Sequence, residues 1–445
     1  MTVCTKFIKF EVNKGLLFGN LLDSLQELIR KDVFGVKRIF VIAIIVVVFV
    51  SLMMTSLGEE KKSLEIWVRS SYYSLLTAAA EKYEQKNPDT EIKVVQPSDV
   101  SDQFALALTS GDEPDMISMD CVLIPYYASI GALTDITDKF KELPYKDTFS
   151  GGLIDLAKYD DAIYAVPFGP DVSVLLYNKE HFREVGLDPE KGPITWDELV
   201  EYAKKLTTSE HYGYVFGAGD SGTMMFTFVP YIWCNGGDVM NKDGTRSMLD
   251  QPEAIEALQF MCDLANKYKV SPEGITSYGW TEAQDAFLSG KASMIVLGSN
   301  AVRGMVSGDY DIEAGICLIP SKDGKTFSSF SGGDSLTITY SCPNKDLAWD
   351  FIKFCLTEDV QVEEMAKYGQ LPARSDLFDN KYFNEFPEYK VLKEALVVAE
   401  APYSLKYNEM YVPFLDGVQA AINGTMTAGE AFTSAAENIN NLLAE

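Results

Sequence analysis

The feature that most constrains the fold is the regular alternation of strand-like and helix-like segments from residue 63 onward. The apolar run LEIWV predicts a short strand, and SLLTAAAEKYEQKNP follows as a helix with Leu76, Ala80 and Tyr83 on one face. EIKVVQ predicts a second strand, DQFALALTSG a second helix, and PDMISM a third strand. This order favours a parallel sheet with helices on its faces, and therefore an α/β fold.

Two later segments add to this pattern. VSVLLY, from Val172 to Tyr177, is a nearly continuous apolar run that predicts a buried strand, introduced by a kink that contains Pro167, Gly169 and Pro170. NKDLAWDFIKFCL predicts a helix with Leu347, Phe351 and Phe354 on one face, and AGEAFTSAAENINNLL predicts a last helix. At 445 residues the chain is too long for one ordinary core, so we expect two globular units.

Charge and cysteine usage exclude some classes of function. The formal net charge of −27 argues against nucleic-acid binding, which needs Lys and Arg to neutralise phosphates. The seven cysteines form no C-x-x-C motif, and we expect neither a metal nor a cofactor. Several cysteines lie in apolar runs such as GICLIP and FIKFCL, which favours buried free thiols over disulfides.

One segment near the N-terminus differs from the rest. IFVIAIIVVVFVSLMMTSLG, residues 39–58, carries no charge, follows Lys37 and Arg38, and precedes EEKK. It is either a cleaved signal or a transmembrane anchor, and a buried core helix is the remaining alternative. Basic residues before it and acidic residues after it predict that Ser63 onward lies outside the cytoplasmic membrane. Residues 1–38 would then form a cytoplasmic leader, to which we assign no role.

Polar and aromatic residues follow several of the expected strands. LEIWV runs into Arg69, Ser71 and Tyr72, PDMISM runs into Asp120, and ASMIVL runs into a segment that contains Asn300. In open α/β sheets, ligands collect beyond the carboxyl ends of the strands. These residues are therefore candidates for one binding site.

Five stretches in the same order carry a resemblance to a known family. They are EPDMISMD; YDDAIYAVPFGPDVSVLLYNKEHF followed by ITWDELVEYAKKL; FLSGKASMIVLGSNAV; CPNKDLAWDFIKF; and GQLPARSDL. From about Ser63 to Leu443, the chain resembles the extracellular solute-binding proteins of carbohydrate ABC transporters, the cluster that includes maltose-binding protein.

The resemblance implies a periplasmic-binding-protein-like α/β fold, in which two α/β lobes are joined by crossover strands at a hinge and preceded here by the N-terminal apolar helix. Lobe one would comprise residues 63–171 and about 335–372, and lobe two residues 172–330 and about 373–445. Such a protein captures a sugar or oligosaccharide between its lobes and delivers it to the ABC permease subunits in the membrane. A monomer that performs no chemistry is expected.

The resemblance also implies a set of substrate-binding residues. Asp171 would face the cleft, although it could instead cap a turn or pair with Arg69. Asp120 matches a sugar-contacting carboxylate of the family. Ser71 and Tyr72 match the polar loop after the first strand. Phe226 and Tyr411 match positions where an aromatic residue stacks on the sugar, and Trp233 is a second choice for the position of Phe226. For each of these aromatic residues, core packing is the alternative.

Two departures from the family pattern make the expected pocket more polar. Asn300 stands where many relatives have Trp, and Asp334 stands where an aromatic or small residue is common. A very polar or amine-bearing solute would therefore also fit.

Three other functions remain open from the sequence. Asp120 and Asp171 could form the carboxylate pair of an extracellular glycan hydrolase or lyase. A receptor that feeds a membrane sensor kinase would use the same fold with another partner. A phosphate- or carboxylate-binding variant would need Arg69, Arg303 and Arg374 near the cleft. No G-x-S-x-G, H-E-x-x-H or P-loop motif supports an enzyme.

Overall fold

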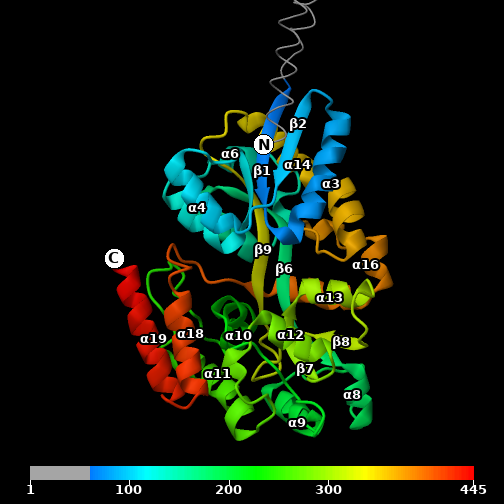
Figure 1. The fold of residues 1–445 in the computed structure, drawn as a ribbon, viewed down its shortest axis with the longest axis vertical. Helices are drawn as coiled ribbons and strands as arrows, with labels where there is room; N and C mark the ends of the chain where they lie inside the picture. Colours follow the sequence, from blue (N-terminus) through cyan, green and yellow to red (C-terminus); the bar gives the residue numbers. More distant parts are fainter. Residues whose placement is uncertain (1–60) are drawn as a thin grey trace, which may run out of the picture. The chain divides into compact units, whose positions relative to one another are not determined.

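The sheet at the centre of the fold is mixed rather than purely parallel (Figure 1). The computed structural model describes residues 61–445, of which Lys62–Glu445 form one unit. The predictions for residues 1–38 and 39–58 therefore lie outside the described residues. Within residues 61–445, the structure contains no helix with the length and hydrophobicity needed to span a membrane.

The strands of the main sheet run in the order β2-β1-β3-β9-β6-β7, while β10 pairs with β9 and β8 pairs with β6. As predicted, β1 pairs in parallel with β2 and with β3. β9 is antiparallel to both β3 and β6. The strand bounds are β1 Lys62–Val68, β2 Thr90–Val95, β3 Met116–Asp120, β6 Ala165–Asn178, β7 Met294–Gly298, β8 Ala314–Cys317, β9 Ser329–Ile338 and β10 Ala399–Glu400, with β4 Lys158–Tyr159 and β5 Ala162–Ile163 as a separate hairpin.

Helices gather in two groups, one around β1, β2 and β3 and the other around β7 and β8 (Figure 1). Those of the first group and its neighbours are α3 Ser70–Lys86, α4 Val100–Ser110, α5 Ile124–Ser129, α6 Thr137–Lys141, α7 Gly151–Leu156, α14 Lys345–Cys355, α15 Glu358–Val360, α16 Lys381–Glu385 and α17 Glu388–Val397. Those of the second group are α8 Lys179–Glu184, α9 Trp196–Leu206, α10 Ser221–Cys234, α11 Pro252–Cys262, α12 Trp280–Leu288, α13 Ser299–Val306, α18 Tyr411–Ile422 and α19 Ala428–Leu443.

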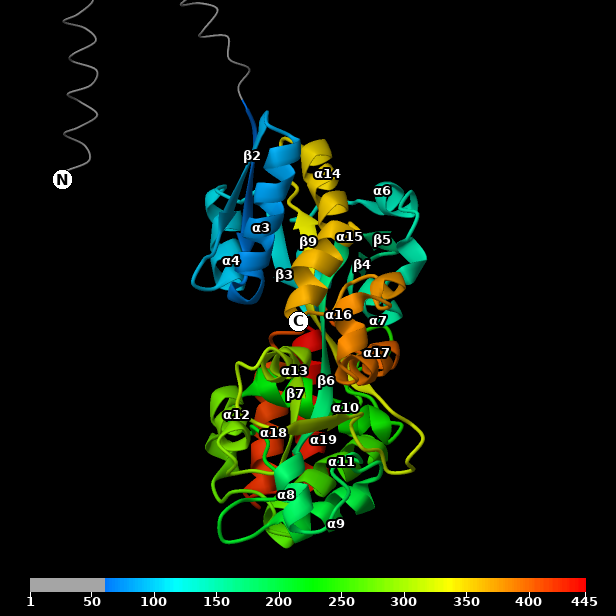
Figure 2. The ribbon, with the colours of Figure 1, turned by 90° about the vertical axis from the view of Figure 1, so that its right-hand side faces the viewer.

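The long strands β6 and β9 run from one group of helices to the other (Figure 2). The first part of β6 pairs with β9, and its second part pairs with β7 and β8. β6 begins at Ala165, so the prediction that a kink introduces a strand at Val172 is wrong. Pro167 and Gly169 instead flank a β-bulge inside the strand, where a missing amide donor is tolerated.

A glycine allows β9 to lie unusually close to its antiparallel neighbour β6 at this point. Gly333 has φ +104°, and a side chain there would collide with the carbonyl oxygen of Gly169. The hydroxyl of Tyr72 donates to that same carbonyl at 2.6 Å. This close approach of the two strands is therefore fixed both by backbone conformation and by a buried side chain.

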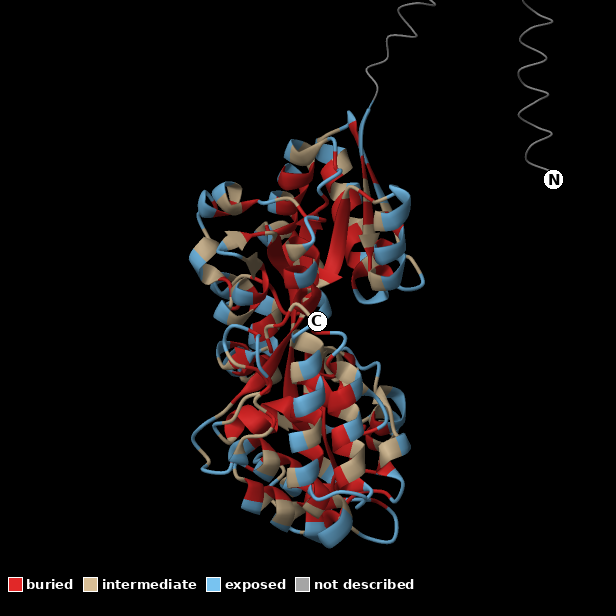
Figure 3. Cartoon of the chain, turned by 90° about the vertical axis from the view of Figure 1, so that its left-hand side faces the viewer, coloured by how far each residue is buried: buried red, intermediate tan, exposed pale blue. Residues whose placement is uncertain are grey.

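The core lies along the strands and the inner faces of the helices, with the outer faces of the helices exposed (Figure 3). On α14 the buried face carries Ala348, Phe351 and Ile352, whereas Leu347 and Phe354 are only partly buried. The predicted face of this helix is therefore rotated, because Trp349 and Cys355 also turn inward. The six cysteines of residues 61–445 are free thiols, and all but Cys317 are buried. The prediction of a buried free thiol is confirmed for Cys355 of FIKFCL, whereas Cys317 of GICLIP is free but only partly buried.

Candidate functional site

A cavity of about 330 Å³ is lined by residues from both groups of helices and from the two long strands between them. The ends of β1 and β3 contribute one wall, the helices α10, α12 and α13 the opposite wall, and β6 and β9 the back. The lining residues are Arg69, Ser71, Tyr72, Asp120, Val122, Asp171, Gly222, Phe226, Trp280, Asn300, Phe330, Gly332, Gly333, Tyr407 and Tyr411.

Strand register assembles a charged cluster on the β-strand wall. Asp120 of β3 lies directly opposite Asp334 of β9, and Ser118 of β3 pairs with Val68, the last residue of β1. The next residue after β1 is Arg69, which therefore enters beside the two carboxylates. Like charges opposite one another on neighbouring strands are destabilising unless a cation lies between them.

Arg69 supplies that cation. Its Nη1 donates to Asp120 Oδ2 at 2.8 Å, its Nε donates to Asp334 Oδ1 at 2.7 Å, and its Nη2 also donates to Asp334. Ser118 Oγ donates to the other oxygen of Asp334 at 2.6 Å. Burial alone would lower the pKa of Arg69, but the charges of Asp334 and Asp120 outweigh it and raise that pKa well above its usual range.

Asp171 belongs to β6, and its side chain contacts Ser299, the first residue of α13. Its Oδ1 accepts the backbone N–H of Ser299 at 2.8 Å and the Ser299 hydroxyl at 2.5 Å. A side chain at Gly298 would press on the Asp171 carboxylate, with an ideal Cβ 2.8 Å from Oδ2, so glycine is needed for this approach. Burial raises the pKa of Asp171 despite these hydrogen bonds. The alternative that Asp171 caps a turn is therefore partly correct, although the residue also lines the cavity.

Aromatic rings cover much of the opposite wall. Phe226 of α10 meets Trp280 of α12 edge to face, with ring centroids 5.9 Å apart and an interplanar angle of 65°. The indole Nε1 of Trp280 donates to Gln284 Oε1 at 2.9 Å, and Gln284 donates in turn to Tyr310. This relay fixes the orientation of the Trp280 ring, which is only partly buried.

A second aromatic pair lies at the start of α18. The rings of Tyr407 and Tyr411 are 5.2 Å apart in an edge-to-face arrangement. Burial raises the pKa of both tyrosines, and the nearby Asp120 charge adds to the effect. Both phenols therefore stay protonated and able to donate.

Most of the residues predicted from the sequence line this one cavity, namely Ser71, Tyr72, Asp120, Asp171, Phe226, Asn300 and Tyr411. Trp233 and Asp334 do not line it. Trp233 packs on Phe330, at 5.9 Å between ring centroids, and donates to Asp238. Asp334 lies behind Arg69 and is fully buried. That the lining residues bind a solute stays a prediction.

Sequence reasoning missed Trp280 and Tyr407. It placed Arg69 at a strand end among the candidate binding residues but did not include it in the set implied by the resemblance. Tyr407 lies four residues before Tyr411, which is a spacing that helical periodicity could have indicated. Trp280 is the first residue of α12, and Gly279 is the N-cap residue of that helix. Nothing in the sequence around Trp280 indicates that its side chain lines a cavity.

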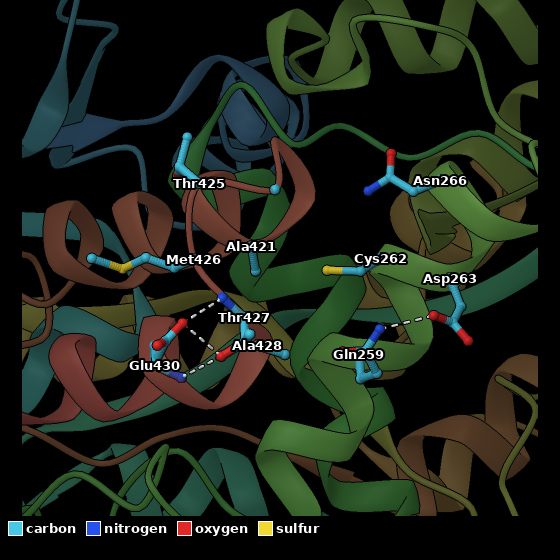
Figure 4. Close-up of a pocket in the computed structure, with 11 residues that line it drawn as sticks. Gln259, Cys262, Asp263, Asn266, Ala421, Thr425, Met426, Thr427, Ala428 and Glu430 are labelled. Atoms are coloured by element: carbon cyan, nitrogen blue, oxygen red, sulfur yellow. Dashed lines mark hydrogen bonds between the residues drawn. The ribbon is translucent and has the colours of Figure 1, made fainter.

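A larger hollow of about 430 Å³ lies between α11 and the turn that joins α18 to α19 (Figure 4). Its polar side chains bond mainly within their own elements: Gln259 donates to Asp263, and Thr427 donates to Glu430. It contains none of the predicted site residues. Within residues 61–445, no group of three or more His, Cys, Asp or Glu side chains is arranged to hold a metal ion.

Comparison with known proteins places this geometry in context. The sequence model of the family described as bacterial extracellular solute-binding protein matches residues 68–362. A maltotriose-binding protein of Pyrococcus abyssi is 25% identical over 80% of this chain and 76% of its own length. A binding protein of Brucella abortus is 24% identical over 55% of this chain, and the match spans only 59% of that relative.

A solved structure shows the same arrangement of strands and helices. The solute-binding protein of an ABC transporter from Thermotoga lettingae, bound with α-D-tagatose, superimposes with a TM-score of 0.76 at 27% identity. The superposition covers 86% of this chain and all of the other, which shows the periplasmic-binding-protein-like α/β fold expected from the sequence.

Proposed function

Since the chain belongs to the family of bacterial extracellular solute-binding proteins, we propose that it captures a sugar or an oligosaccharide in the cavity described above. It would then deliver that solute to the permease subunits of an ABC importer. The observation that carries this proposal is the joint lining of one cavity by both groups of helices and by the two strands that connect them. A solute held there contacts every part that a closing motion would bring together.

The chemistry of the lining suits a carbohydrate. Sugars present C–H faces, which pack on aromatic rings such as Trp280 and Phe226, and hydroxyl groups, which donate to carboxylates such as Asp120 and Asp171. Asn300 adds an amide that can both donate and accept. The solutes named for the relatives, maltotriose and tagatose, belong to this chemical class.

The connecting strands support a division into two hinged lobes. Lobe one would comprise residues 63–171 and about 335–372, and lobe two residues 172–330 and about 373–445, as expected from the resemblance. β6 and β9 would act as the hinge. They pair with each other, and β9 also pairs with β3 of proposed lobe one, while β6 also pairs with β7 of proposed lobe two. A solute that binds both lobes favours the closed state by its differential affinity, and no chemical step is required.

The contacts of the carboxylates weigh against the glycan hydrolase alternative. Asp120 forms a salt bridge with Arg69 at 2.8 Å, and Asp171 accepts two hydrogen bonds from Ser299, so neither carboxyl group is without partners. A hydrolase needs one carboxylic acid free to protonate the leaving group. We therefore propose that the protein binds its solute without turnover. Incubation of the purified chain with labelled oligosaccharides tests this, and the appearance of any cleavage product would contradict it.

Export is proposed on the same grounds. The family acts outside the cytoplasm, and the charge pattern around residues 39–58 favours that orientation. A receptor that feeds a sensor kinase would share the fold and the cavity. Copurification with permease subunits rather than with a kinase distinguishes the two partners.

The cavity is tested by Asp120→Ala. Loss of a charge-assisted hydrogen bond should weaken sugar binding by about 1.5–3 kcal/mol, measured by titration calorimetry with mono- and oligosaccharides. The melting temperature of the unliganded protein should change by no more than about 4 °C, because Arg69 keeps its bonds to Asp334. Asp138→Asn, which removes a fully exposed carboxylate, is the matched control. Unchanged affinity in Asp120→Ala would place the site elsewhere.

A further inference from the structure

We propose that the solute carries a protonated amine, so that the preferred guest is an amine-bearing sugar rather than a purely neutral or an acidic one. This inference rests on the proposed function and specifies the substrate class of the same cavity. Three features of the cavity carry it: an excess of negative charge, a carboxylate with no salt bridge among the described residues, and aromatic rings in the same cavity.

The charge balance of the cavity is negative. Among the described residues that line it, Arg69 is the only cation, whereas Asp120 and Asp171 are both anions. Asp334, directly behind Arg69, takes up two of the donors of that guanidinium. Asp220, the N-cap residue of α10, adds a further exposed carboxylate two residues before Gly222, which lines the cavity. A cationic solute would offset this excess, and an anionic one would increase it.

Asp171 is the carboxylate without a salt bridge among the described residues, and the charge of Arg69 acts on it more weakly than its burial does. Asp120 and Asp334 share Arg69, but Asp171 forms no salt bridge among residues 61–445, and both of its bonds to Ser299 come from uncharged donors and end on Oδ1. Burial raises the pKa of Asp171, which is the response of a carboxylate whose charge is incompletely compensated. An ammonium group from the solute would supply that compensation.

Aromatic rings complete a setting that favours a cation. Trp280 and Phe226 present their rings from lobe two, and Tyr411 presents its ring from the start of α18. Ring faces attract ammonium groups, most strongly where water is excluded. They also pack on the C–H faces of a sugar ring. Carboxylates and rings in one cavity can therefore bind both halves of a polyhydroxy amine.

The experiment compares matched sugars on the full chain, purified in mild detergent, by titration calorimetry at pH 6. The probes are D-glucosamine, N-acetyl-D-glucosamine, D-glucose and D-glucuronate, together with the β-1,4-linked disaccharides of the first three. Acetylation removes the charge and keeps the nitrogen. We expect each amine to bind at least about tenfold tighter than its acetylated and neutral counterparts, with glucuronate weakest.

Two variants connect this preference to the cavity. Asp171→Asn keeps an oxygen that can accept from Ser299 but removes the charge. It should weaken the binding of neutral sugars, whose hydroxyl groups lose a charged acceptor, and weaken the binding of the amines more, so that most of the amine preference is lost. Asp138→Asn, which removes a fully exposed carboxylate, should keep the preference for amine-bearing sugars.

The outcomes separate this inference from the proposed function. Neutral or acetylated sugars that bind as tightly as the amines, or an amine preference that persists in Asp171→Asn, would overturn the inference and leave sugar capture intact. A panel in which no sugar of any charge binds would overturn both.

Discussion

At the scale of single residues, the site depends on contacts between positions far apart in the chain. Arg69 meets Asp120 and Asp334 because β1, β3 and β9 are neighbours in the sheet and end in register. The same logic gives Asp334 a positioning role, since its oxygens are occupied by Arg69 and Ser118. Asp171, by contrast, is held only by neutral donors, and its titration should be visible in the stability of the protein.

Asp171→Asn tests that titration. Burial raises the pKa of Asp171, so the folded protein holds this proton more tightly than the unfolded chain does. The stability contributed by the protonated group is present below the unfolded pKa, near about 3.9, and is lost as the pH rises through the folded pKa. We expect the free energy of unfolding of the wild type, relative to Asp171→Asn, to fall from pH 4 toward pH 7 in urea titrations. A difference that does not change with pH would contradict the assignment.

At the scale of elements, the structure shows which segments act together. β7 runs directly into α13, so that the strand end, the Asp171–Ser299 bonds and Asn300 form one continuous piece. At the other end of β7, Ser293 contacts the rings of His181 and His211, which are stacked with centroids 3.9 Å apart. This corner places the two histidines of the chain in contact and largely away from water.

The histidine stack should make this corner sensitive to acid. Burial lowers the pKa of His181, and the neighbouring His211 lowers it further, against the opposing charges of Glu184 and Glu180. The neutral ring of His181 contributes to the stability of the folded protein above the unfolded pKa of about 6.5, and this contribution is lost as the pH falls through the folded pKa. His181→Phe keeps a flat ring for stacking and cannot be protonated.

We therefore expect the free energy of unfolding of the wild type to fall more steeply than that of His181→Phe between pH 7 and pH 5. Denaturant titrations at each pH measure this slope. Equal slopes for the two proteins would show that His181 does not titrate differently in the folded and unfolded states.

At the scale of the whole unit, β6 and β9 are the connections that a hinge motion would bend. Gly333, with its positive φ, and the β-bulge between Pro167 and Gly169 lie side by side in these strands. The residues that line the cavity come from both groups of helices and from these two strands. Binding of a solute should therefore change the arrangement of the proposed lobes.

Small-angle X-ray scattering of the purified chain checks this motion. Addition of a sugar that binds should reduce the radius of gyration, because the solute favours a closed arrangement. Asp120→Ala, at sugar concentrations that leave it unliganded, should keep the radius of the free protein. Saturated binding with no change in the radius would exclude closure as the response to the solute.

The sequence by itself determined the α/β class, the positions of the strands and helices named in the sequence analysis, the free state of the thiols and about half of the residues that line the cavity. These depend on local periodicity and on the rule that polar residues at strand ends gather at one edge of a sheet. The sequence did not reveal that Pro167 and Gly169 lie inside β6, that Arg69 joins two carboxylates, or that Trp280 faces the same cavity as Asn300. Only the tertiary structure decided these points, because strand register and the packing of distant helices depend on contacts that no local pattern encodes.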